Sequence, residues 1–100
     1  MTEYTNAPGA ELPKYKCYKE VWALKIDKII YDVIEAKKEN RDTDGTAQIF
    51  PKDQRYAPFK VSREYVDKHV PHPGGYYVVY KDGYKSFSPA EAFEEGYTLL

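Results

Sequence analysis

Residues 74–87, with the sequence GGYYVVYKDGYKSF, decide the fold class of this chain. The aromatic and β-branched run Tyr76–Tyr80 is typical of a strand, and a second short run follows the dipeptide Asp82-Gly83. Because Asp-Gly favours a two-residue turn, we expect an antiparallel hairpin in which Val79 pairs with Ser86. The chain is therefore predicted to contain a C-terminal β-hairpin.

A helix signal follows the hairpin directly. Ser88-Pro89-Ala90-Glu91 places a serine at the N-cap, a proline at the first helical position and a glutamate where it completes a capping box. Phe93 falls on the apolar side of the short helix that would follow, and Gly96 is a natural C-terminal stop. We therefore predict a short C-terminal helix with Phe93 in the core.

A second short helix is predicted ahead of the hairpin. Prolines break regular structure before Phe59-Lys60-Val61, and Ser62 directly after this piece is a preferred N-cap residue. About two turns of helix would then carry Tyr65 and Val70 toward the core, before Pro71 ends the helix.

The front half of the chain supplies further strands. Trp22, Leu24 and Ile26 alternate with other residues at the period of two that is typical of a strand with one buried face. Helical spacing also fits residues 21–36, but β-branched and aromatic residues are concentrated there and no capping signal precedes them, so a strand is favoured. Thr46–Phe50 is predicted to be a short return strand after a charged turn.

Together these elements predict an α+β fold, a small antiparallel β-sheet with a C-terminal β-hairpin and two short helices. The sheet would take its other strands from the Trp22 segment, the Ile30 region and the Thr46 segment. Residues 1–14 are polar and are interrupted by glycine and prolines. We therefore expect a flexible N-terminal arm over these residues and a single α+β domain over residues 15–100.

The composition fits one globular domain. The chain has 100 residues, of which 42% are hydrophobic and 31% charged, and this excludes a disordered tail and a disulfide scaffold. Its 15 Lys and Arg residues against 16 Asp and Glu residues give a net charge of -1, which argues against the wrapping of duplex nucleic acid. Cys17 is a lone cysteine, no signal peptide opens the chain, and no apolar run reaches membrane-spanning length. We therefore expect a soluble intracellular protein with no membrane partner.

Residues 74–97, GGYYVVYKDGYKSFSPAEAFEEGY, resemble the C-terminal motif of small proteins encoded by tailed bacteriophages and prophages. Residues 15–26 are similar to the opening strand of that family, and residues 56–61 to its central segment. The resemblance implies expression in the cytoplasm of a bacterial host cell and an accessory role outside the virion. It supplies no catalytic residue.

Catalytic constellations are not recognisable in the sequence. Ser86 and Ser88 have no nucleophile-elbow motif around them, and Ser88 is already assigned to a helix cap. His69 and His72 lie on either side of Pro71 at a helix end, so we do not expect them to share a metal ion. We therefore predict that the chain is not an enzyme and has no catalytic residues, no bound metal and no cofactor.

Tyrosine is the outstanding residue type, with 11 copies. In the predicted hairpin, tyrosines alternate with lysines, a mixture that can stack a nucleobase and bind its phosphates. One hairpin is too small to enclose a ligand, so residues from the centre of the chain or from a second subunit would complete the site, and a homo-oligomer is predicted. The candidate ligand-binding residues are Tyr77, Tyr80, Lys81, Tyr84, Lys85, Arg55, Tyr56 and Arg63. The equally weighted alternative is that lysine stems cover exposed rings for solubility alone.

Two functions follow from these observations. In the first, the protein is a phage counter-defence protein that sequesters a host immune signalling nucleotide. In the second, it is a protein–protein interaction module that docks on and inhibits a host or phage enzyme, with tyrosines as interface anchors. Protection of the hairpin rings by nucleotides would favour the first, and stoichiometric capture of a host protein would favour the second.

Overall fold

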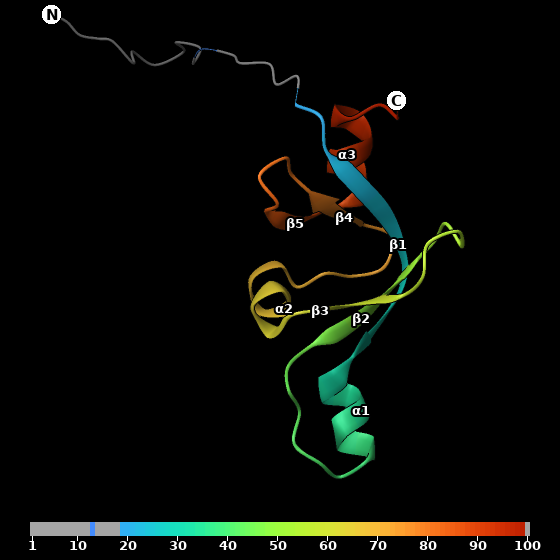
Figure 1. Cartoon of the computed structure of the whole chain (residues 1–100), viewed down its shortest axis with the longest axis vertical. Helices are drawn as coiled ribbons and strands as arrows, with labels where there is room; N and C mark the ends of the chain where they lie inside the picture. The colour runs from blue at the N-terminus through green and yellow to red at the C-terminus, as the bar shows by residue number, and fades with distance from the viewer. Residues whose placement is uncertain (1–12, 14–18, 100) are drawn as a thin grey trace, which may run out of the picture.

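A computed structural model of the chain describes residue 13 and residues 19–99 (Figure 1). The predicted flexible arm, apart from Pro13, and the lone Cys17 lie outside the described residues. The strands and helices are β1 (Trp22–Tyr31), α1 (Asp32–Lys38), β2 (Ala47–Pro51), β3 (Phe59–Val61), α2 (Arg63–His69), β4 (Tyr76–Val79), β5 (Lys85–Ser88) and α3 (Ala90–Gly96).

The strands form one antiparallel sheet in the order β3-β2-β1-β4-β5. The long strand β1 is central: its first half pairs with β4 and its second half with β2, so the sheet curls along β1 (Figure 1). The predicted α+β class is confirmed, and β3 and α1 are additions that the sequence pattern does not predict.

A β-bulge in β1 determines which side chains enter the core. Ile26 is aligned with Pro51 and Lys28 with Phe50, so Asp27 is an extra residue on β1. Alternation alone would place Ile26 and Ile29 on opposite faces, whereas the extra residue lets both contact the same core cluster. The segment predicted as strand over residues 21–36 is therefore a bent strand to Tyr31 that continues directly into α1.

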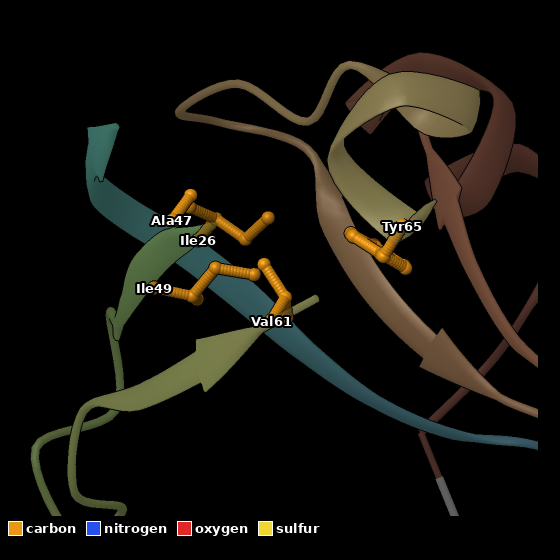
Figure 2. Close-up of a cluster of buried hydrophobic side chains, with 5 residues drawn as sticks. All are labelled: Ile26, Ala47, Ile49, Val61 and Tyr65. Carbon is orange, nitrogen blue, oxygen red and sulfur yellow. The ribbon is translucent and has the colours of Figure 1, made fainter. Parts of the chain in front are cut away.

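The buried cluster lies between the curled sheet and α2. Figure 2 shows four aliphatic side chains from β1, β2 and β3 gathered together, with Tyr65 contributed by α2. The members of the cluster are Ile26, Ala47, Ile49, Val61 and Tyr65. Tyr65 is only 6% exposed, and its hydroxyl donates a hydrogen bond of 2.7 Å to the carbonyl oxygen of Ser86 in β5. This bond connects α2 to the edge of the sheet opposite β3.

Helix α2 begins as predicted and ends differently. The Ser62 hydroxyl accepts a 3.1 Å hydrogen bond from the Tyr65 amide, which confirms the predicted N-cap. Val70 adopts a left-handed conformation with φ 42° and is 63% exposed, so the prediction that it faces the core is wrong. The left-handed residue turns the chain away from the helix. Pro71, which follows it, is buried, and its carbonyl oxygen accepts a hydrogen bond from the Tyr31 hydroxyl.

The hairpin is present, but its predicted register is wrong by one residue. Val79 is paired with Lys85, not with Ser86, and Tyr77 is paired with Phe87. Directly paired residues share a face of the sheet, so Tyr77 and Phe87 both pack against the buried cluster.

The length of the turn explains the shifted register. The Tyr80 amide donates to the Tyr84 carbonyl and the Gly83 amide donates to the Tyr80 carbonyl, each at 2.9 Å. Gly83 has a φ of 89°, so the turn is a three-residue loop that ends in a left-handed glycine. The two-residue turn predicted from Asp82-Gly83 requires a positive φ at Asp82. Among the described non-glycine residues, Asn40 and Val70 have a positive φ and Asp82 does not, so this turn does not form.

Helix α3 is held by its side chains and not by the predicted capping box. Pro89 occupies the N-cap position, and the Ser88 hydroxyl donates to the Pro89 carbonyl at 3.3 Å instead of capping the helix. Phe93 stacks on Tyr76 of β4 with ring centroids 4.1 Å apart, and Glu94 accepts a 2.7 Å hydrogen bond from the Tyr76 hydroxyl. Phe93 is half-buried, so it anchors the helix on the sheet without belonging to the buried cluster.

Replacing Tyr65 by Phe tests the link between α2 and β5. The substitution keeps the ring but leaves the Ser86 carbonyl without its donor, and we expect the free energy of unfolding to fall by about 1 to 3 kcal/mol. Urea denaturation followed by circular dichroism measures this. Tyr56→Phe is the matched control, because Tyr56 is 51% exposed. Equal stability of the two variants would contradict the assigned role of the hydroxyl.

Two glycine-to-alanine changes test the packing where β4 begins. A Cβ at Gly75 would collide with the Phe87 ring and stand 2.9 Å from the Ser88 carbonyl, whereas a Cβ at Gly96 has no neighbour within 4 Å. We expect Gly75→Ala to cost about 1 to 3 kcal/mol of stability and Gly96→Ala to be neutral or slightly stabilising. Thermal melting of both variants measures this, and a similar effect of the two would show that the close packing at Gly75 is not limiting.

Candidate binding surfaces

The eight predicted ligand-binding residues do not converge on one site. Tyr80, Lys81 and Tyr84 line a hollow at the tip of the β4–β5 hairpin. Tyr56 and Tyr77 line a second, more apolar hollow. The other three, Lys85, Arg55 and Arg63, are among the lining residues of neither hollow.

The second hollow, which we call the Trp22 groove, has a volume of about 210 Å³. Cross-strand pairing builds it: Trp22 is aligned with Val79 and Leu24 with Tyr77, which places these four side chains on one face of the sheet. Tyr56 joins them from the connection between β2 and β3. The lining residues are Trp22, Ala23, Leu24, Tyr56, Tyr77 and Val79.

Trp22 is exposed on the Trp22 groove and is not part of the core. Its exposed fraction is 62%, and that of Tyr56 is 51%. The sequence pattern places Trp22 on the same face as Leu24 and Ile26, but α2 covers this face only further along β1, where Ile26 is buried. The prediction that Trp22 is a core residue is therefore wrong. Two exposed aromatic rings over an apolar floor are typical of an interface anchor.

Tyr77 connects the Trp22 groove to the buried cluster. Its ring meets the edge of Phe59 with centroids 4.8 Å apart and lies 5.6 Å from the ring of Tyr65. Burial raises the pKa of the Tyr77 hydroxyl above its ordinary value. Tyr77 thus forms a rigid floor that belongs as much to the core as to the surface.

The first hollow, which we call the tip hollow, is larger, at about 710 Å³. The rings of Tyr80 and Tyr84 are nearly parallel, at 27° with centroids 6.1 Å apart. A lysine ammonium lies near each ring: Lys19 is 5.9 Å from the centroid of Tyr80, and Lys68 is 5.1 Å from that of Tyr84. The lining residues are Lys19, Glu20, Tyr80, Lys81, Asp82 and Tyr84.

Tyr84 is held in place from α2 as well as from its own hairpin. Its hydroxyl lies 3.4 Å from Nε2 of His69, and the two rings meet edge to face at 6.0 Å. Burial lowers the pKa of His69, and the positive charge of Lys68 lowers it further. The imidazole is therefore kept in its neutral form near pH 7, in which one ring nitrogen is an acceptor. The Tyr84 ring is thus contacted from α2 as well as from its own hairpin.

The two predicted arginines already have carboxylate partners. Arg55 makes a two-pronged contact with Asp53, with its Nη2 2.7 Å and its Nε 3.0 Å from the carboxylate oxygens. Arg63 lies 3.8 Å from Asp67, one helical turn along α2. The Arg55 guanidinium lowers the pKa of Asp53 to about 2.

Asp32 is the most heavily bonded carboxylate that the sequence patterns missed. It receives two hydrogen bonds from the Arg41 guanidinium, at 2.9 and 3.2 Å, one from the Thr43 hydroxyl at 2.8 Å and one from the Asp44 amide at 3.2 Å. These donors hold the pKa of Asp32 well below its usual range. Asp32 thus folds the loop after α1 back onto the start of that helix, which is a structural role. No group of metal-ligating side chains occurs among the described residues.

The described residues form a small α+β domain with two hollows on its surface. In a comparison with solved structures, the chain is similar to the phage L decoration protein, whose monomeric form was determined in solution by NMR. The TM-score is 0.57 and the sequence identity 29%, over 93% of this chain. The chain spans 61% of the length of that protein. No protein-family model and no curated protein matches the sequence.

This similarity supports the resemblance to bacteriophage proteins and corrects the predictions built on it. The solved structure that the chain matches is that of a decoration protein, and this contradicts the predicted accessory role outside the virion, as a counter-defence protein that sequesters a signalling nucleotide, which is therefore wrong. The predicted partners, a nucleotide signal or a host protein, and the predicted location in the host cytoplasm are wrong for the same reason. The prediction that the chain is not an enzyme is confirmed by the likeness to a decoration protein. No described helix has the length and apolar character to cross a membrane.

The ion pair of Arg55 gives a pH-dependent prediction. Because the folded pKa of Asp53 is depressed to about 2, the pair contributes stability above the ordinary Asp pKa of about 3.9 and loses it as the pH falls through about 2. Arg55→Gln should raise the Asp53 pKa toward the ordinary value, and Arg63→Gln should leave it unchanged. NMR titration of the Asp53 side-chain carboxyl carbon measures both. An unchanged Asp53 pKa in Arg55→Gln would show that Arg55 is not the cause.

Proposed function

We propose that this chain decorates the outer surface of a bacteriophage capsid and docks there through the Trp22 groove. The similarity to the phage L decoration protein, over 93% of the chain, supports the capsid as the partner. The choice of surface rests on Trp22, which is exposed although it is a large aromatic side chain. Exposed apolar groups gathered at one place mark interaction sites on soluble domains.

The chemistry of the Trp22 groove suits a protein partner. No charged side chain is among the described residues that line it, so covering these residues costs no desolvation of charge. Pairing with β4 fixes the backbone of Trp22 and Leu24, and the Tyr77 ring packs against the edge of Phe59. Little side-chain freedom on the floor is lost on docking, which favours affinity for a given buried area.

The interaction-module hypothesis survives in its general form. A decoration protein acts by binding another protein surface, which fits aromatic anchors on a rigid sheet. In this proposal the partner is the capsid coat, and no enzyme has to be inhibited.

Trp22→Ala tests the docking surface. We expect the affinity for capsids to fall by about tenfold or more, since truncation of a central aromatic anchor costs more than about 1.4 kcal/mol. Co-sedimentation with capsids of the encoding phage, prepared without this chain, measures the binding. Ile34→Ala is the control, because Ile34 is an apolar residue of α1 with a similar exposed fraction of 53%.

The outcomes separate the partner from the surface. Absence of wild-type co-sedimentation would overturn the capsid proposal. Wild-type binding with equal binding of Trp22→Ala would keep the capsid and reject the groove. Because Trp22 is exposed, its replacement should change the free energy of unfolding by only about 0.5 kcal/mol, and thermal melting checks that the variant is folded.

A further inference from the structure

We infer that the tip hollow is a carbohydrate site, in which the pyranose ring of a neutral glycan packs on Tyr80 and Tyr84. This inference goes beyond capsid decoration and does not depend on it. The lining residues of the tip hollow and of the Trp22 groove have no member in common.

The two tyrosines provide the apolar part of such a site. Their rings are nearly parallel and stacked, with centroids 6.1 Å apart, so two aromatic rings lie side by side at this hollow. A pyranose has one face of C–H groups, which carry partial positive charge and are attracted by the negative face of an aromatic ring. His69 and Lys68 hold Tyr84 from the side of α2, so its ring is positioned in advance.

The charged residues of the tip hollow provide both hydrogen-bond donors and acceptors. Lys19 and Lys81 are donors, and Glu20 and Asp82 are acceptors. Asp82 Oδ1 accepts the Tyr84 amide at 2.9 Å, and a carboxylate with about four lone-pair positions keeps acceptor capacity beyond that bond. Each sugar hydroxyl is both donor and acceptor, so a glycan can satisfy all four side chains.

The same four charges argue against an anionic ligand. Two lysines and two carboxylates are among the described residues that line the tip hollow, and Lys68 lies over the Tyr84 ring beside them, so a phosphate attracted by the lysines would also be repelled by Glu20 and Asp82. A neutral polyhydroxylated ligand avoids this repulsion. The volume of about 710 Å³ lies within the range of small-ligand sites, and it has room for more than one sugar ring.

The test uses the purified 100-residue chain and a panel of neutral sugars. Methyl glucoside, methyl galactoside, methyl mannoside, N-acetylglucosamine and their disaccharides are titrated against ¹⁵N-labelled protein, and amide shifts are followed by NMR. We expect at least one sugar to shift the amides of residues 80–84, with Tyr80→Ala weakening its binding by about tenfold. Tyr80→Phe keeps the aromatic ring, so its affinity for the sugar should stay within about threefold of the wild-type affinity.

Tyr56→Ala is the matched control, because it removes an exposed tyrosine from the Trp22 groove and should leave sugar binding unchanged. Three results would overturn the inference: no amide of residues 80–84 shifts with any sugar at its highest soluble concentration, Tyr80→Ala binds like the wild type, or ADP binds more tightly than every sugar. A Tyr80→Ala spectrum without dispersed amides would indicate that this variant is misfolded. In that case sugar binding by Asp82→Asn is compared with that of the wild type, and we expect weaker binding by Asp82→Asn. Since capsids are absent from this experiment, its failure leaves the decoration proposal unaffected.

Discussion

The hydrogen bond from the Tyr65 hydroxyl to the Ser86 carbonyl holds the two ends of the curled sheet in one unit. In the strand order β3-β2-β1-β4-β5, β3 and β5 are the outer strands, and α2 lies between them along the buried side. Burial raises the pKa of Tyr65 and keeps the hydroxyl protonated as a donor. The same residue packs against the ring of Tyr77, so the closing contact and the floor of the Trp22 groove are mechanically connected. The floor of the Trp22 groove therefore depends on one side chain of a seven-residue helix.

The bulge at Asp27 shows why the front of the chain was ambiguous in sequence. A strict strand repeats every two residues, and one inserted residue converts part of this repeat into a spacing of three, as between Ile26 and Ile29. Spacings of three and four are those of a helix, so a bulged strand and a helix give similar patterns. The bulge also lets one strand serve two neighbours, because its halves pair with β4 and β2 in turn.

Local chemistry was predictable from sequence where one residue decided it, and tertiary placement was not. The Ser62 cap and the existence of the hairpin follow from residue type alone. The hairpin register depends on whether the loop has two or three residues. Asp82-Gly83 fits both kinds of loop, so the sequence alone does not decide the register. Alternation gave the face of Trp22 correctly but carries no information on where α2 stops covering that face. The eight candidate residues were chosen for their residue types, which carry no information on distances between segments. In the structure three of them line the tip hollow, two line the Trp22 groove and three line neither.

Desolvation separates the roles of the two hollows. Four charged side chains are among the described residues that line the tip hollow. Covering them with a protein partner would remove their water, and imperfectly paired charges would not recover that cost. The described residues that line the Trp22 groove include no charged side chain, so its burial releases water mainly from apolar surface. A protein interface is therefore favoured at the groove and disfavoured at the tip. A hydroxylated ligand can replace water at charged groups one hydrogen bond at a time, which makes the tip hollow better suited to a small soluble molecule than to a second protein.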